Sequence, residues 1–111
     1  MKDRLELEHQ IQKEVELLRP EERLRNEIDI IFSFENGDLI LFEVRPAWNK
    51  PMEIIHSPFA KASFVQSREI WRIYWMRGNL KWHPYAPAPQ VGSVRKFFEL
   101  VKEDKHCCFF G

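Results

Sequence analysis

The chain has little of what marks secreted or membrane-spanning proteins. Its 111 residues contain no apolar run long enough for a signal-peptide core or a membrane span, and the N-terminus is charged from the start. We therefore expect a cytosolic protein with no membrane partner. The two cysteines, Cys107 and Cys108, are adjacent and cannot close the long loop from which a disulfide draws its stabilising effect, so we predict reduced thiols.

The chain also lacks an excess of charge of either sign. Seventeen basic residues balance seventeen acidic ones, which excludes the strongly basic footprint typical of duplex DNA or bulk RNA binding. A nucleic-acid site would need a local basic patch. The length predicts one domain over residues 1–111, and a hydrophobic fraction of 44% is typical of a packed globule.

Apolar periodicity predicts a helix at each end of the chain. One apolar stripe, at spacings of four, four and three, indicates an amphipathic helix over residues 3–18, with Asp3 as N-cap and Pro20 ending it. A second stripe indicates a helix from residue 94, with Ser93 as N-cap. The stripe residues are Leu7, Ile11, Val15 and Leu18, then Val94, Phe97, Phe98 and Val101.

Between the helices the period changes to two, which predicts strands. Residues 24–34 and 39–45 alternate in this way and flank Asn36-Gly37, the strongest short hairpin signal. A two-residue loop would place Phe34 opposite Leu39. Proline-rich residues 45–58 predict an irregular connection, and residues 61–66 predict another strand.

Residues 69–85 hold three of the four tryptophans and both tyrosines, and they predict a second hairpin. A two-residue turn at Gly78-Asn79 would make Trp75 and Trp82 neighbours on a buried apolar face. The opposite face would then carry Arg72, Tyr74, Met76, Lys81, His83 and Tyr85.

These elements together predict an α+β fold. The order is an N-terminal helix, an antiparallel meander of about five strands and a C-terminal helix. We expect a single layer of sheet with helix on one face, the other face being left to loops, solvent or a partner.

Four segments resemble a known family: RPAW (45–48), AKASFV (60–65), WRIYWMRGNLKWHPY (71–85) and DKHCCFFG (104–111). The family consists of small bacterial proteins described only as a domain of unknown function. Its members share an RPxW segment, a WxLYW run followed by KWHxY, and an aromatic-glycine end that is often Phe-Trp where this chain has Phe109-Phe110. The resemblance implies a cytosolic bacterial protein of one domain, and it implies no activity or cofactor.

The aromatic and cationic side chains of the second hairpin suggest a binding surface. Rings on a sheet can stack bases while cations hold phosphates, which is a sequence-tolerant way to bind single strands. We predict a non-catalytic module for single-stranded nucleic acid, a nucleotide-like ligand or a protein partner, with a homodimer as one form of the last. The predicted ligand-binding residues are Arg72, Tyr74, Lys81, His83, Tyr85 and Trp48.

The alternative function is that of a metal-dependent nuclease-like enzyme. Asp29 on one strand and Glu43 and Arg45 on the next resemble a carboxylate pair that holds Mg²⁺ beside a cation. The predicted register places Asp29 and Glu43 on opposite faces, so the simpler interpretation is a Glu43–Arg45 surface pair. The same register puts Glu43 and Arg45 on the face of the apolar set, so either they pair at its edge or a bulge intervenes.

A zinc site would have to gather His83, His106, Cys107 and Cys108, and a cysteine nucleophile would take one of these histidines as its base. Adjacent His-Cys-Cys does not readily supply three tetrahedral ligands, and no orienting third group is evident for a nucleophile. We predict no structural metal and no cofactor.

Overall fold

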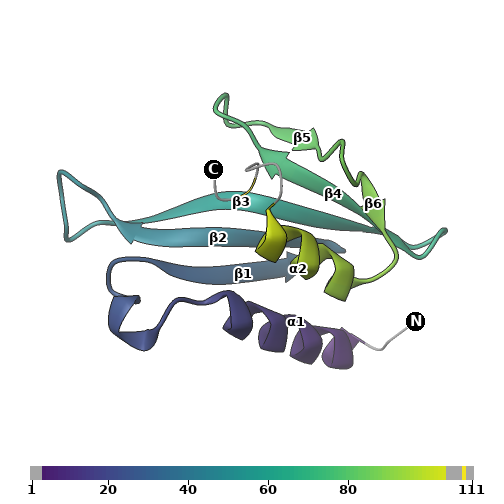
Figure 1. The fold of residues 1–111 in the computed structure, drawn as a ribbon, viewed down its shortest axis with the longest axis horizontal. Helices are drawn as coiled ribbons and strands as arrows, with labels where there is room; N and C mark the ends of the chain where they lie inside the picture. The colour runs from purple at the N-terminus through teal and green to yellow at the C-terminus, as the bar shows by residue number, and fades with distance from the viewer. Residues whose placement is uncertain (1–3, 105–108, 110–111) are drawn as a thin grey trace.

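The computed structural model describes residues 4–104 and residue 109, and it has the predicted α+β fold (Figure 1). One helix precedes the strands in the chain and another follows them. The strands form an antiparallel sheet in which β1 to β5 are neighbours in chain order, with β6 paired to β4. The helices are α1 (Arg4–Leu18), the 3-10 helix η1 (Glu22–Leu24) and α2 (Val94–Glu103). The strands are β1 (Asp29–Glu35), β2 (Asp38–Pro46), β3 (Ile54–Val65), β4 (Ile70–Met76), β5 (Trp82–Pro84) and β6 (Gln90–Val91).

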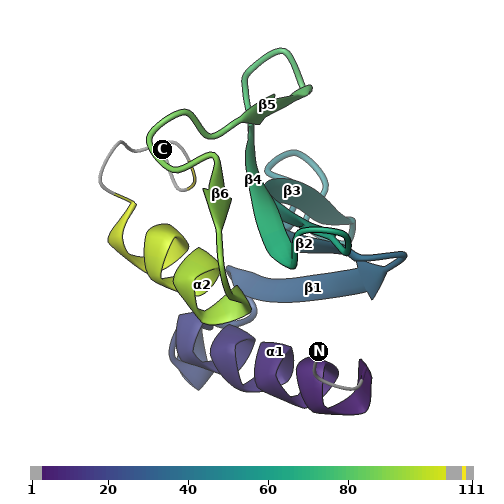
Figure 2. The same ribbon diagram turned by 90° about the vertical axis from the view of Figure 1, so that its right-hand side faces the viewer.

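Both helices cover the same side of the sheet (Figure 2). Helix α1 packs its predicted stripe inward through Ile11 and Val15, which are buried. Helix α2 begins where Ser93 accepts a hydrogen bond from the Lys96 N–H at 3.3 Å, as its N-cap role predicts. The predicted cap of α1, Asp3, lies outside the described residues.

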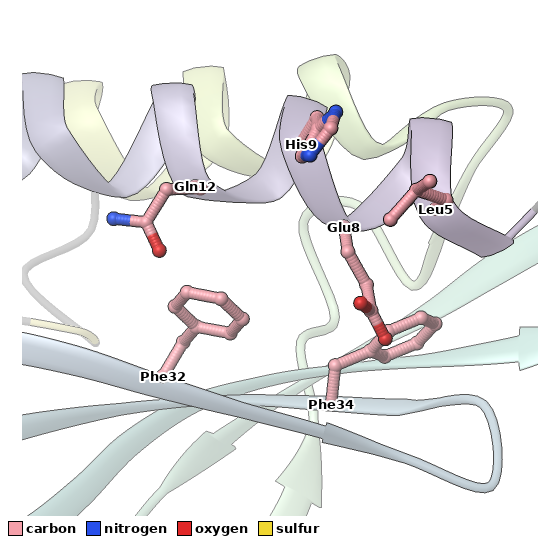
Figure 3. Close-up of a pocket in the computed structure, with 6 residues that line it drawn as sticks. All are labelled: Leu5, Glu8, His9, Gln12, Phe32 and Phe34. Atoms are coloured by element: carbon pink, nitrogen blue, oxygen red, sulfur yellow. The ribbon is translucent and has the colours of Figure 1, made fainter.

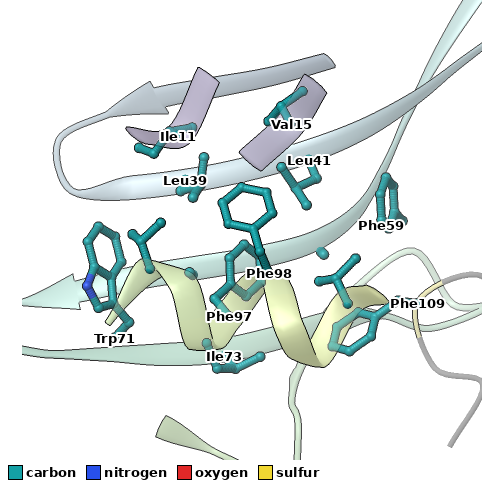
Figure 4. Packing of buried hydrophobic residues seen from close by; sticks show 14 of the residues in the cluster. Ile11, Val15, Leu39, Leu41, Phe59, Trp71, Ile73, Phe97, Phe98 and Phe109 are labelled. Atoms are coloured by element: carbon teal, nitrogen blue, oxygen red, sulfur yellow. The ribbon is translucent and has the colours of Figure 1, made fainter. Parts of the chain in front are cut away.

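The core lies between the two helices and the sheet face that they cover (Figure 4). Phe97 and Phe98 of α2 stand at its centre and have no exposed surface. Helix α1 supplies Ile11 and Val15 from the other side. The sheet contributes every second residue of its central strands: Leu39, Leu41, Ala60, Ala62, Trp71 and Ile73.

The first hairpin has the predicted register. Phe34 lies opposite Leu39, and the turn residues Asn36 and Gly37 both have positive φ, at 52° and 81°. A two-residue turn of the primed type requires positive φ at both positions, which asparagine and glycine tolerate. Strand β1 begins five residues later than predicted, because η1 and its following turn occupy residues 22–27.

The prediction of an irregular connection over residues 45–58 is wrong at both of its ends. Strand β2 continues to Pro46 and β3 begins at Ile54, so the two strands form a ribbon that extends past their neighbours. Strand β4 pairs with β3 only as far as Ala60, and β1 reaches only Val44. We call this projection the arm: residues 44–56, with residues 47–53 at its tip (Figure 1, far left).

The prolines of the arm stand where a strand tolerates them. Ala47 donates its backbone N–H to Glu53 at 2.9 Å, so this pair is hydrogen-bonded across the ribbon. Hydrogen-bonded and open pairs alternate along an antiparallel ladder, so Pro46 and Pro58 fall at open positions. Their nitrogens therefore face the outer edges of the ribbon, where a missing N–H takes nothing from the ladder.

The register predicted for the second hairpin is wrong by one residue. Trp75 lies opposite His83, and Met76 lies opposite Trp82. The loop has three residues rather than two, and the positive φ falls on Leu80, at 61°. Because side chains alternate between faces, this shift moves Trp82 to the side away from the helices and turns His83 towards them.

Candidate binding surface

The side of the sheet that faces away from the helices carries large apolar side chains. Its positions follow from the strand register, in which Ile31 pairs with Phe42, and Ile40 with Lys61. A solvated face of an antiparallel sheet usually carries polar residues at these positions. Within the part of the chain that the structure describes, no helix or strand covers this side (Figure 2). We call it the open face: Ile31, Ile40, Phe42, Val44, Lys61, Arg72, Tyr74, Met76 and Trp82.

Lys61 stands between two aromatic rings on the open face. Its Nζ lies 4.8 Å from the ring centre of Tyr74 and 5.2 Å from that of Trp82. Both contacts fall within the range of a cation–π interaction, which fixes the ammonium group over the sheet. The cluster joins β3, β4 and β5, and it combines a cation with two flat apolar surfaces.

The structure keeps two of the predicted ligand-binding residues on this face and turns two to the other side. Arg72 and Tyr74 lie on the open face, where the sequence placed them. His83 and Tyr85 turn to the helix side, because of the register shift of β5. Tyr85 is 2% exposed and packs on Phe109, with ring centres 4.8 Å apart, so its predicted place on the polar-aromatic face is wrong.

Lys81 belongs to the exposed loop of the second hairpin. Its carbonyl accepts the Arg77 N–H at 3.2 Å, and its own N–H donates to Asn79 Oδ1 at 3.1 Å. Asn79 in turn lies against His83, with Nδ2 and Nε2 3.3 Å apart. The loop therefore holds these polar groups near its own backbone, at one edge of the sheet.

Trp48 lies apart from the other predicted site residues, at the tip of the arm. Its side chain is 93% exposed, and that of Met52 beside it in the tip is 95% exposed. Strand β3 runs six residues past the end of its pairing with β4, which is about 20 Å at about 3.3 Å per residue. Trp48 therefore belongs to a different surface from Tyr74.

Lys61 and Trp82 were missed as candidate site residues. Trp82 was placed in the core by the two-residue turn assumed for its hairpin. Lys61 lies between Ala60 and Ala62 at the start of the segment predicted as a strand. That alternation was the usable signal, since burial of Ala60 and Ala62 places Lys61 on the opposite face.

The three residues of the nuclease alternative do not converge. Asp29 accepts a bidentate pair of hydrogen bonds from Arg19, each 2.9 Å long, and the hydrogen bonds from Arg19 hold the pKa of Asp29 below its usual value. Glu43 pairs with Arg45 at 2.8 Å, as the simpler interpretation predicts. Glu43 lies opposite Ile30, so Asp29 and Glu43 point to opposite faces. A bulge also lies beside this pair, between Leu41 and Phe42.

Of the residues considered for a zinc site or a thiol nucleophile, the structure describes only His83. His106, Cys107 and Cys108 lie outside the described residues. Among residues 4–104 and 109, no three histidine, cysteine or acidic side chains are grouped as metal ligands. In the same part of the chain, no helix is long and apolar enough to cross a membrane.

A pocket of about 400 Å³ lies between α1 and β1 (Figure 3). Glu8 and Gln12 extend from α1 towards Phe34 and Phe32, which form its floor. Both polar groups have partners on the helix: Glu8 accepts from Arg4 at 2.9 Å, and Gln12 donates to Glu16 at 3.0 Å. The pocket is thus a gap in the packing of α1 on the sheet edge, and its polar side chains form hydrogen bonds within the helix.

A larger groove of about 680 Å³ lies at the end of the sheet opposite the arm. It runs between the N-terminal end of α1, the start of α2 and the turns that follow β1 and β3. Its aromatic residues are Phe34, Phe64 and Trp71. The ring centre of Trp71 lies 6.1 Å from that of Phe34 and 4.9 Å from that of Phe64. Arg4 lies over the Phe34 ring, 5.4 Å from its centre.

Comparison with known proteins places the chain in a family without assigning it an activity. No curated protein and no solved structure matches it. A family model covers nearly its whole length, in agreement with the resemblance of its aromatic segments. The chain belongs to the family described as "Domain of unknown function (DUF3024)", whose model matches residues 2–111.

Proposed function

We propose that this protein is a non-catalytic binding module and that its open face docks a protein partner. The observation that carries the proposal is the row of apolar side chains where a solvated sheet would carry polar ones: Ile31, Ile40, Phe42, Val44, Met76 and Trp82. Contiguous apolar surface of this kind, rimmed by polar residues, marks interaction sites on soluble proteins.

The charges on the open face favour a protein over a polyanion. Lys61 and Arg72 are its cations, while Glu35 and Asp38 stand at its end on the same side of the sheet. The Asp38 carboxylate is held there by a 2.6 Å hydrogen bond from the Ser63 hydroxyl. Carboxylates beside the two cations would repel phosphates, whereas a protein surface of mixed charge accommodates both signs.

The test is affinity capture from extracts of the source cells with three baits. Wild type is compared with Phe42→Lys, which places a charge in the centre of the open face, and with Leu17→Lys, which makes the same change at an exposed position of α1. We expect the same set of captured proteins with wild type and Leu17→Lys, and its loss with Phe42→Lys. Thermal melts establish that each bait is folded. Equal capture by all three baits would contradict docking on the open face.

Single-stranded nucleic acid is a second candidate ligand, supported by the Lys61 cluster. Tyr74 and Trp82 offer two rings beside a cation, which is the arrangement that stacks bases and holds phosphates. Its few cations would neutralise few phosphates, so affinity would be modest and weakly dependent on salt.

Fluorescent single-stranded RNA and DNA oligonucleotides, titrated at two salt concentrations, test this candidate. Tyr74→Ala should weaken binding by about 1–3 kcal/mol at both salt concentrations through lost stacking. Lys61→Met should mainly flatten the dependence on salt. Oligonucleotide binding that neither variant weakens would show that the nucleic-acid site lies outside the open face.

A further inference from the structure

The arm tip is the most exposed apolar surface among the described residues. Trp48 and Met52 are almost fully exposed, and Ile54 and Ile55 behind them are about half exposed. Tryptophan dominates the binding energy of many protein interfaces, and methionine adapts to irregular pockets. The tip carries one charge of each sign, Lys50 and Glu53, and therefore has no electrostatic attraction to an anionic membrane.

The edges of the arm are less suited to binding than its tip. Pro46 and Pro58 direct their nitrogens to the two outer edges, which interrupts the row of donors that an added strand would use. A partner would therefore receive the side chains of the tip rather than extend the ribbon.

The same chain carries a surface that fits such a tip. The groove at the far end of the sheet has the rings of Phe34, Phe64 and Trp71, and its rim carries one charge of each sign, Arg4 and Glu69. Its volume of about 680 Å³ is ample for an indole ring and a thioether, since pockets of about 300–1,000 Å³ hold whole drug-sized ligands.

A chain cannot fill its own groove, because tip and groove lie at opposite ends of the molecule. The tip follows the last residue of β2 and precedes the first of β3, whereas the groove includes the turns at the other ends of these strands. The twelve residues of β3 alone span about 40 Å. The described residues extend 45 Å along their longest axis.

We propose that the arm tip of one copy docks into the groove of a second copy, and that two such contacts close an antiparallel pair. Two copies related by a two-fold axis bring each tip to the other copy's groove, because the separation of tip and groove is the same in both. The balanced net charge of the chain sets up no repulsion between copies.

The area available reaches the lower limit of a specific interface. An exposed tryptophan alone offers about 200 Å². With Met52, two tips and the two groove surfaces that receive them bury on the order of 1,000 Å², about the least that a specific interface needs. This pairing goes beyond the proposed function, since it uses the tip and the groove and leaves the open face free.

The test is the solution mass of the full chain across a dilution series, by sedimentation. Wild type should pass from dimer to monomer on dilution. Trp48→Ala should raise the dissociation constant at least about 30-fold, as loss of a central tryptophan does. Gly92→Leu should do the same by filling the groove, because Gly92 lines it and a Cβ there meets no atom within 4 Å. Leu17→Ala, at an exposed site on α1, and Tyr74→Ala, on the open face, should leave the dimer unchanged.

A mixing experiment tests the reciprocal contact. Trp48→Ala and Gly92→Leu should each be monomeric alone, while their mixture should form a heterodimer through the one intact tip and the one open groove. A wild type that stays monomeric at every concentration, or a dimer that survives Trp48→Ala, would overturn the proposal. Masses that rise beyond the dimer would overturn the closed pair, and loss of the dimer in Tyr74→Ala would assign the contact to the open face instead.

Discussion

The two faces of the sheet are built from similar residues and used differently. The helix-covered face buries Leu39, Leu41 and Ile73, whereas the open face presents Ile40, Phe42 and Met76 at the alternate positions. A strand with apolar residues on both sides is typical of a sheet covered on both faces. The difference between the faces is therefore one of coverage, and the proposed partner would supply the second layer.

The largest effect should come from truncating matched phenylalanines on the two sides of the sheet. Phe97→Ala removes a ring with no exposed surface and should lower the free energy of unfolding by about 3–5 kcal/mol. Phe42→Ala, on the half-buried open face, should lower it by at most about 1.5 kcal/mol. Urea denaturation of both variants measures the difference. Equal losses would mean that the open face is as much a part of the core as the helix side.

The two tryptophans of the second hairpin lie on opposite sides of the sheet. Trp75 packs against the core on the helix side, so Trp75→Ala should cost about 2–3 kcal/mol. Trp82 lies on the other side, and Trp82→Ala should cost about 1 kcal/mol or less. A two-residue turn would bury both tryptophans on one face and predicts a large loss of stability for each variant. Urea melts of the two variants therefore distinguish that register from the observed one, in which Trp75 lies opposite His83.

Asp29, the first residue of β1, is bound by a residue that follows helix α1. Arg19, just after α1, binds its carboxylate through two hydrogen bonds, so Asp29→Asn should cost about 1.5–3 kcal/mol at neutral pH. The pKa of Asp29 is lowered from its ordinary value of 3.8, chiefly by the Arg19 hydrogen bonds. Its stabilisation is therefore complete above that value and fades as the pH falls through the lowered pKa.

Melts of wild type and Asp29→Asn from pH 7 down to pH 2 measure this dependence. The difference in stability between the two proteins should be largest above pH 4 and shrink below it, since the variant has no carboxyl group to protonate there. A difference that stays constant over the whole range would show that the pair acts through packing alone.

The smallest effect should follow the loss of the cation on the open face. Lys61→Met removes the ammonium group from Tyr74 and Trp82 and keeps most of the side-chain length, so stability should fall by only about 0.5–1 kcal/mol. Tryptophan fluorescence should report the altered environment of Trp82. A loss as large as that of a core residue would contradict a solvent-facing cluster.

The two hairpins show how much of the fold could be predicted from the sequence. Asn36-Gly37 specifies its turn locally, because both residues accept the positive φ that a two-residue turn requires, and the predicted register is confirmed. Gly78-Asn79 resembles the same signal, yet the chain adds Leu80 to the loop. The added residue turns Tyr85 into the core beside Phe109, a packing gain that no local pattern reveals.

The candidate site was harder to predict, because it depends on which strands pair and how they are shifted. Tyr74 and Arg72 were placed on the correct face from alternation alone. Tyr85 and His83 were assigned to that face only through the assumed turn, so one added residue in the loop moved both. The arm was hidden by its prolines, which suggested an irregular segment and which the outer edges of a ribbon tolerate.

The most direct test of a partner on the open face is photo-crosslinking in the source cells, with a benzoyl-phenylalanine in place of Tyr74. The same group in place of Leu17, on the exposed side of α1, is the control. We expect a discrete adduct with another protein from position 74 and none from position 17. Absence of any adduct from position 74, or the same adducts from both positions, would contradict the claim that the open face is a docking surface.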